Sequence, residues 1–277
     1  MEKVYERKLT VSEAEDGITV KEMLRGRGFS RRLMTKLRET EGIREDSRVV
    51  RLCDKCRCGQ VLTVTEPENS PPEPNYSLNV PVLYEDRDVI VFDKPADMPV
   101  HESIKHRGDT LANCYAAVCA GLTFRPVNRL DRDTAGCVVA AKTRYGAAIL
   151  QGSIEKVYTG LVPPTKLSGG RICAPIARQE ESIILRCVRD DGKFAATCWQ
   201  VIERRADSTL CRFMLETGRT HQIRVHMAHI GLPLLGDDMY GGDCSARTGQ
   251  ALMCSEVSFI SPDSGERVRV FSNRKLG

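Results

Sequence analysis

Proline and glutamate crowd one short segment of the chain, between residues 66 and 75. The segment reads Glu-Pro-Glu-Asn-Ser-Pro-Pro-Glu-Pro-Asn, with four prolines and three glutamates in ten residues. Because proline supplies no backbone N–H, this composition favours an extended spacer over a packed helix or strand. The chain is 277 residues long, enough for one large and one small folding unit. We therefore predict a small domain over residues 1–66, a linker over 67–79 and a large domain over 80–277.

Apolar residues in the small domain recur at helical spacing. They predict two short helices separated by Gly26-Arg27-Gly28-Phe29, and Ser30 stands where the N-cap of the second helix is expected. Residues 48–52 and 60–64 then read as two strands around a cysteine-containing loop, which indicates a hairpin. The apolar positions of the two helices are Val20, Met23, Leu24, Leu33, Met34 and Leu37.

Positive charge is concentrated in this small domain, although the net charge of the whole chain is only +4. A local basic excess on a small module is expected where the partner is a polyanion such as RNA. A solvated helix face gives the same pattern, and charge alone leaves the two interpretations open. The basic residues are Lys21, Arg25, Arg27, Arg31, Arg32, Lys36, Arg38, Arg44, Arg48, Arg51, Lys55 and Arg57.

Cysteines and histidines raise the question of a metal. Of the 12 cysteines, Cys53, Cys56 and Cys58 share one loop that could offer thiolates to zinc, but no fourth ligand lies nearby in sequence. The offsets of five and three among His221, His226 and His229 do not match the His-x-x-x-His spacing of helical zinc sites. We predict no metal, with a zinc-stabilised interaction module at the Cys53–Cys58 loop as the open alternative, and we expect most thiols to be reduced.

The ends of the chain and its apolar runs bear on location. The first eight residues are rich in charge, and no run of about 18 apolar residues occurs anywhere. We expect a cytoplasmic protein that has no membrane partner and acts as a monomer.

Strands and helices mix irregularly in the large domain, which favours one mixed α+β domain. No strand is followed by a glycine-rich phosphate-binding loop, so nucleotide cofactors are not indicated. Strands are expected over residues 89–92, 137–141, 156–162, 194–202 and 210–215, and helices after Asp109 and over 145–154.

One carboxylate stands out in this domain. Asp131 follows Arg129 and Leu130 and precedes a Thr-Ala-Gly turn and an apolar strand. Aspartate is common in turns and caps because its side chain accepts hydrogen bonds from nearby backbone N–H groups. A structural role and a chemical role are both open until partners for the carboxylate are found.

Three segments of the large domain, in this order, resemble motifs of one enzyme family. The stretch 128–136 resembles its His-Arg-Leu-Asp-x-x-Thr-Ser-Gly motif, the stretch 156–162 resembles its Lys-x-Tyr strand, and the stretch 217–228 contains Gly-Arg-Thr-His-Gln-Ile-Arg. Together they are similar to the RluA-type RNA pseudouridine synthases, over most of residues 80–265. Supporting stretches are 83–86, 93–95, Gly192, Lys193, Thr197 and 231–237.

The resemblance implies an α+β catalytic domain with a mixed, largely antiparallel sheet and flanking helices, and a reaction without a cofactor. Asp131 would be the essential carboxylate, either a nucleophile at C1′ or the base that removes the 2′ proton. Arg224 would be its partner, and Tyr158 would stack on the uracil. Arg129 would help hold the flipped nucleotide, and the remaining substrate-binding residues would be Arg219, Thr220, His221 and Gln222.

The small domain resembles the S4 RNA-binding module over residues 15–65, through its paired basic helices. This resemblance implies an α-β domain that docks ribosomal or transfer RNA through Arg31, Arg32, Lys36 and Arg38. Taken together, the two resemblances predict an enzyme that isomerises specific uridines in structured RNA.

The chain also departs from the family pattern. Asn128, Ala135 and Asp97 replace the usual His, Ser and Gly, and Leu252-Met253-Cys254 replaces Leu-His-Ala. A catalytically silent RNA-binding protein is therefore the alternative, against which the joint presence of Asp131, Tyr158 and Arg224 argues. Which RNA and which uridine are modified does not follow from the sequence.

Overall fold

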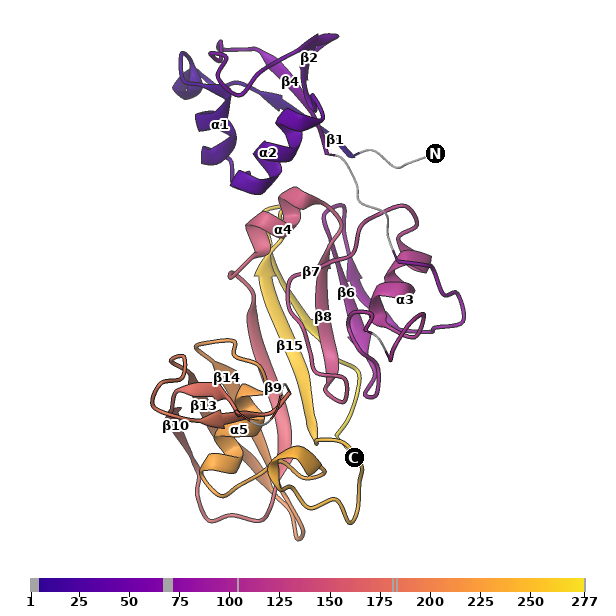
Figure 1. Cartoon of the computed structure of the whole chain (residues 1–277), viewed down its shortest axis with the longest axis vertical. Coiled ribbons are helices and arrows are strands. Elements are labelled where there is room, and N and C mark those ends of the chain that lie inside the picture. Colours follow the sequence, from indigo (N-terminus) through magenta and orange to yellow (C-terminus); the bar gives the residue numbers. More distant parts are fainter. Residues whose placement is uncertain (1–4, 67–71, 104, 181, 183, 277) are drawn as a thin grey trace.

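The computed structural model describes residues 5–66, 72–103, 105–180, 182 and 184–276, and within them two sheets with separate hydrophobic cores. We call residues 5–66 the N-terminal unit and residues 72–276 the large unit. Residues 67–71 of the predicted linker lie outside the described part of the chain. In Figure 1 the N-terminal unit lies above one end of the large sheet.

The N-terminal unit packs two helices against a small antiparallel sheet. Thr19 and Ser30 cap the helices, because their side chains accept hydrogen bonds from the backbone N–H groups of Glu22 and Leu33. The strand order is β1-β4-β2-β3. The elements are β1 (Tyr5–Thr10), α1 (Val20–Gly26), α2 (Arg31–Glu39), β2 (Ile43–Glu45), β3 (Arg48–Val49) and β4 (Val61–Glu66).

The two helices and the N-cap at Ser30 are confirmed, but the predicted hairpin is wrong. Strand β3 pairs with β2, whereas β4 pairs with β1 and β2. The chain after Val50 does not turn back along β3. It instead crosses the N-terminus of α1, where the backbone N–H groups of Val20 and Lys21 donate to the carbonyl groups of Asp54 and Leu52.

The cysteine loop points its thiols in different directions. Cys56 is buried, with its sulfur 3.9 Å from that of Met23, while Cys53 and Cys58 are exposed. Among the described residues, no three potential metal ligands of the His, Cys, Asp or Glu type gather at one place.

Ten strands form the sheet of the large unit, and the predicted α+β class with a mixed, largely antiparallel sheet is confirmed. Every pairing is antiparallel except that of β15 with β8. The order is β10-β13-β14-β9-β15-β8-β6-β5, with β16 beside β15 and β7 beside β8. The strands are β5 (Val82–Glu85), β6 (Val89–Lys94), β7 (Arg125–Pro126), β8 (Ala135–Ala141), β9 (Glu155–Val162), β10 (Gly169–Cys173), β13 (Ala196–Arg204), β14 (Thr209–Leu215), β15 (Leu252–Ile260) and β16 (Arg267–Phe271).

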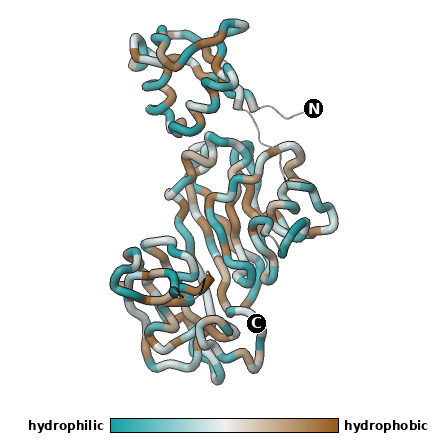
Figure 2. Tube along the Cα trace, viewed as in Figure 1, coloured by the Kyte–Doolittle hydropathy of each residue, from teal (hydrophilic) through white to brown (hydrophobic). Residues whose placement is uncertain are grey.

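Three α-helices and a two-stranded sheet accompany it, all of them within the described residues. Figure 2 shows the apolar residues following the central strands, and all six residues of β6 are buried. The remaining elements are α3 (Leu111–Val118), α4 (Arg144–Leu150), α5 (Gln222–His229), β11 (Ile176–Arg178), β12 (Arg186–Val188), and the short 3-10 helices η1 (Glu13–Glu15) and η2 (Asp238–Tyr240).

Two expectations for this unit need correction. The helix expected over 145–154 ends at Leu150, because Gln151 is extended and Gly152 adopts a φ of +80°. Strand β15, which lies between β9 and β8, was not predicted at all. Within the described residues, no helix is both long enough and apolar enough to cross a membrane.

Candidate active site

Asp131 lies in the loop that leads from β7 into β8, where the predicted turn forms. Its backbone carbonyl accepts a hydrogen bond from the N–H of Thr134, which closes the turn. Its carboxylate is 30% exposed and faces α5. Gly136 follows at a φ of +103°, and a Cβ atom there would lie 2.1 Å from the carbonyl oxygen of Cys254. Only glycine therefore lets β8 approach β15 this closely at the start of the strand.

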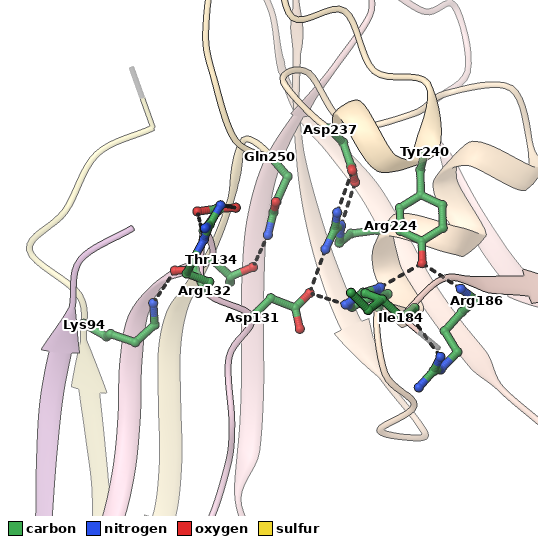
Figure 3. A network of polar contacts seen from close by, with 12 residues as sticks. Lys94, Asp131, Arg132, Thr134, Ile184, Arg186, Arg224, Asp237, Tyr240 and Gln250 are labelled. Carbon is green, nitrogen blue, oxygen red and sulfur yellow. Dashed lines mark hydrogen bonds and ion pairs between the residues drawn. The ribbon is translucent and has the colours of Figure 1, made fainter. Parts of the chain in front are cut away.

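Arg224 connects Asp131 to a second carboxylate. Its Nε and Nη2 donate to the two oxygens of Asp237, both at 2.7 Å, and its Nη1 donates to Oδ2 of Asp131 at 3.2 Å (Figure 3). Arg224 is 4% exposed and Asp237 is fully buried. Burial works against the guanidinium charge, yet the two carboxylates together raise the pKa of Arg224. Asp237 thus fixes the position of the guanidinium that contacts Asp131.

A second contact to Asp131 comes from His221, the N-cap of α5. This residue adopts a left-handed φ of +56°, and its Nε2 lies 3.7 Å from Oδ2 of Asp131. Its Nδ1 lies 2.8 Å from the hydroxyl of Tyr240, which already accepts from the backbone N–H of Arg186. If the Tyr240 hydroxyl donates to Nδ1, the neutral imidazole carries its proton on Nε2, facing Asp131. Burial lowers the pKa of His221, although Asp131 opposes that shift.

Tyr158 extends from the middle of β9 into the same pocket and is largely buried. Burial raises the pKa of its hydroxyl well above the usual value, and Cys254 and Asp131 add to the shift. The phenol is therefore neutral at pH 7. Opposite it, the pairing of β9 with β15 shifts register between Cys254 and Glu256. Such irregularities often re-aim a side chain next to an active site.

The pocket gathers seven of the eight catalytic and substrate-binding residues predicted from the sequence and has a volume of about 70 Å³. Arg129 and Arg219 lie exposed at its rim, and Arg219 donates its Nε to the carbonyl of Phe194. Thr220 is exposed but does not line the pocket. The lining is Arg129, Leu130, Asp131, Thr134, Tyr158, Leu215, Arg219, His221, Gln222, Ile223, Arg224 and Leu252.

Gln222 is buried and uses its amide to hold the site together. Its oxygen accepts from the hydroxyl of Thr217 and the N–H of Arg219, and its nitrogen donates to Ala196 and Thr197. These bonds tie α5 to β13 and orient the rim.

The four predicted RNA-surface residues, by contrast, lie on α2 in the N-terminal unit and not at the pocket: Arg31, Arg32, Lys36 and Arg38.

Lys94 supports the Asp131 loop and was not singled out from the sequence. Its fully buried ammonium donates to the carbonyls of Pro95, Met98 and Arg132 at 2.7 to 2.8 Å. Burial lowers the pKa of Lys94 to about 7, against the charges of Asp133 and Asp131. The bond to Arg132 anchors the residue that follows Asp131 in the chain.

Three further polar residues of the site were also missed. Gln250 donates to the hydroxyl of Thr134 at 3.0 Å and fixes the other side of the turn. Asp237 and Tyr240, described above, complete the set. Asp237 lies in the supporting stretch 231–237. A buried carboxylate needs a charged partner, but that partner, Arg224, is 13 positions away in the chain and reaches Asp237 only through the fold.

Two departures from the family pattern have structural explanations. Asn128 is buried, donates to the carbonyl of Cys137 and accepts from the N–H of Val139, so it braces the Asp131 loop against β8. Asp97, where glycine is usual, adopts a φ of +60°, which aspartate tolerates better than most residues.

Comparison with known proteins agrees with this site. A family model described as RNA pseudouridylate synthase matches residues 88–229. An uncharacterized RNA pseudouridine synthase of Bacillus subtilis (strain 168), YjbO, is 36% identical over 265 residues, covering 91% of this chain and 94% of that protein. Ribosomal large subunit pseudouridine synthase D of Xanthomonas campestris pv. campestris is 35% identical over 267 residues, covering 87% and 80%.

Solved structures give the same answer. The human protein RNA Pseudouridylate Synthase Domain Containing 1 superposes with a TM-score of 0.59 at 25% identity, covering 73% of this chain and 86% of that one. The matched family region contains Asp131, Tyr158 and Arg224. The chain therefore belongs to the RluA-type RNA pseudouridine synthases and isomerises uridine to pseudouridine in RNA.

Proposed function

We propose that this synthase modifies a uridine of large-subunit ribosomal RNA, with Asp131, Tyr158 and Arg224 as its catalytic residues. The observation that carries the catalytic assignment is the convergence of these residues in one pocket from three separate segments. Several relatives named ribosomal large subunit pseudouridine synthase D support the choice of RNA. The monomeric state and cytoplasmic location remain predictions.

The reaction is an isomerisation, so every atom of the uridine is retained. The N1–C1′ bond breaks, the uracil turns, C5 bonds to C1′, a proton leaves C5 and N1 gains one. Within the described part of the chain, the side-chain contacts to the Asp131 carboxylate from Arg224 and His221 both fall on Oδ2. Neither Arg224 nor His221 donates to Oδ1, and this oxygen is the one we assign to the ribose. It can attack C1′ or remove the 2′ proton, and both roles stay open.

Arg224 contacts the Asp131 carboxylate through Nη1, 3.2 Å from Oδ2, and leaves it 30% exposed. Nε and Nη2 of Arg224 are both used by Asp237, so Arg224 reaches Asp131 with Nη1 alone. Because the Asp131 side chain is partly exposed, its carboxylate is accessible to substrate.

Tyr158 is suited to contact the uracil ring of the substrate. Its ring can stack on the uracil, and its neutral hydroxyl can both donate and accept while the C5 proton is transferred. Arg129 and Arg219, exposed at the rim, can contact the phosphates that flank a flipped nucleotide.

A tritium-release assay tests this proposal. The purified protein is incubated with C5-tritiated transcripts of large-subunit ribosomal RNA and, separately, of transfer RNA. We expect release from the ribosomal transcript with the wild-type protein and none with Asp131→Asn. Release only from transfer RNA would overturn the assigned substrate. Full release by Asp131→Asn would overturn the catalytic assignment, and no release from any RNA would favour the catalytically silent alternative.

A further inference from the structure

The two units of the chain are joined by an ion pair that is buried on one side. Arg7 of β1 donates its Nη2 to both carboxylate oxygens of Asp88, at 3.0 and 3.2 Å. Asp88 belongs to the large unit and is fully buried, while the Arg7 side chain is 20% exposed. The guanidinium also lies 3.9 Å from the ring centroid of Tyr145, within cation–π range.

Asp88 fastens this contact to helix α4. Its Oδ1 also accepts a hydrogen bond from the hydroxyl of Thr143, at 2.5 Å. Thr143 is the N-cap of α4, and its oxygen accepts from the N–H of Gly146. One carboxylate therefore binds the N-terminal unit and the first turn of α4 together. Removing one partner of a buried ion pair leaves an uncompensated charge, so this contact resists separation.

Apolar contacts reinforce the junction. The rings of Phe29 and Tyr145 lie 5.7 Å apart, and Tyr145 packs against the core of the N-terminal unit. Gly28 approaches α4 so closely that a Cβ atom there would lie 2.6 Å from Cδ1 of Ile149. Figure 1 shows the N-terminal unit seated over α4 at this end of the large sheet. We call the contact among Arg7, Asp88 and Tyr145 the interdomain lock.

Beside the lock, both units contribute to one basic groove with a volume of about 540 Å³. Four of its six lining residues are cationic and one is acidic, which suits a chain of phosphates. The groove shares Arg31 and Thr35 with a larger groove on the N-terminal unit that Lys21, Arg25, Arg38 and Arg51 also line. We call the smaller one the junction groove; its lining is Arg31, Arg32, Thr35, Lys36, Glu39 and Arg144.

The junction groove lies at a fixed distance from the catalytic pocket. Strand β8 begins four residues after Asp131 and ends three residues before Arg144. Its seven residues span about 20 Å at the usual strand rise of about 3.3 Å per residue. The length of β8, which pairs with β6 from Gly136 to Ala141, therefore separates the carboxylate from the groove, and the interdomain lock keeps α2 at the far end of this strand.

We propose that the junction groove binds the phosphate backbone of the same RNA whose uridine enters the pocket, and that the interdomain lock makes their separation a determinant of which uridine is selected. The proposal rests on the proposed function. Arg144 supplies the large unit's share of the groove, and Arg32 supplies the share of the N-terminal unit. A chain in which the two units moved freely would bind RNA, but the separation between groove and pocket would vary and could not select one uridine.

The test measures binding of a fluorescein-labelled RNA stem-loop of about 30 nucleotides by anisotropy, over a range of KCl concentrations. All proteins carry Asp131→Asn so that no turnover occurs. Arg32→Gln and Arg144→Gln should each weaken binding severalfold and lower the salt slope by about one. Lys166→Gln, which removes an exposed charge between β9 and β10, is the control. It should change neither quantity.

The lock is tested by adding Arg7→Met, or Arg7→Gln if the methionine variant fails to fold. With the lock broken, Arg32→Gln should still weaken binding, but Arg144→Gln should change it less than twofold. An undiminished Arg144→Gln effect in that background would overturn the lock, and no effect of Arg144→Gln in the parent would overturn the groove. If Arg32→Gln is also silent, RNA docking by the N-terminal unit fails as well, whereas tritium release by the wild-type protein tests the catalytic proposal separately.

Discussion

The pocket around Asp131 and the basic surface of helix α2 both use arginine, but in opposite ways. In the pocket, Arg224 is 4% exposed and makes three hydrogen bonds of 2.7 to 3.2 Å with two carboxylates. On α2, Arg31, Arg32 and Arg38 are exposed to solvent. The effect of Arg224 in the pocket depends on its exact position beside two carboxylates. The effect of the exposed arginines on α2 depends on how many positive charges they present together.

This difference predicts how each region responds to change. A buried charge that loses its partner costs several kcal/mol, because no water replaces the lost interaction. An exposed charge is screened by salt and solvated by water, so its removal has a small effect. Substitutions in the pocket should therefore be severe and specific, and those on α2 mild and roughly additive.

The largest effect is expected from Asp131→Asn. Turnover should fall at least about 10³-fold, because the amide can neither attack C1′ nor remove a proton. RNA affinity should stay within about threefold, since the basic surface is unchanged. Single-turnover tritium release measures the first quantity and anisotropy the second. Asp133→Asn is the matched control, because Asp133 lies two residues away and pairs with Arg132; an equal loss there would contradict a specific role for Asp131.

Arg224→Met is expected to come next, with a loss of folding free energy of about 3–5 kcal/mol, because it leaves Asp237 buried without its partner. Arg224→Lys keeps the charge but cannot reach both carboxylates with a planar fork, so it should fold and lose about 10²-fold in turnover. Urea unfolding and tritium release measure the two effects. Arg171→Met breaks the exposed pair with Glu216 and should cost less than about 1 kcal/mol of folding free energy. Similar losses of folding free energy at Arg224 and Arg171 would contradict the difference proposed between buried and exposed arginines.

Lys94 provides a pH test of burial. Its pKa is about 7 in the folded protein and has its ordinary value of 10.5 in the unfolded chain. Between these values the unfolded state binds more protons, so the contribution of Lys94 to stability rises with pH across this window. Relative to Lys94→Met, the wild-type protein should gain about 2 kcal/mol between pH 7 and pH 9. Urea unfolding at both pH values measures this, and a constant difference between the two proteins would refute it.

The smallest effect is expected from Arg38→Gln, on the larger groove of the N-terminal unit. Affinity for RNA should fall only a few fold at about 0.1 M salt, and the salt slope should fall by about one. Turnover at saturating RNA should not change. A loss of turnover at saturation would mean that this exposed residue positions substrate in the pocket, and the proposed division between the two regions would then be wrong.

The prediction from sequence succeeded where the signal was local. The two N-terminal helices follow from apolar spacing, and the second also from its cap, Ser30, only three residues from its partner Leu33. Asp131, Tyr158 and Arg224 followed from a resemblance to three short motifs, and the fold brings all three to one pocket. Local spacing did not give the pairing of β3, because a two-residue strand carries almost no pattern of its own.

The prediction missed what depends on packing over long separations. Strand β15 lies centrally between β9 and β8, yet it begins 90 positions after the end of β9 in the chain. The lysine at position 94 was quoted only as part of a motif, because nothing in the sequence shows that it is fully buried under three carbonyls. The lock between Arg7 and Asp88 spans 81 positions.

The sequence by itself determined the reaction, because Asp131, Tyr158 and Arg224, the residues that we propose for catalysis, stand in recognisable short motifs. Only the tertiary structure decided how they are held: Asp237 and Tyr240 position Arg224 and His221, Lys94 anchors the loop of Asp131, and the N-terminal unit lies against α4. The physical reason is that a hydrogen bond or ion pair depends on distance in space, and burial sets its strength, whereas residue type and spacing along the chain fix neither.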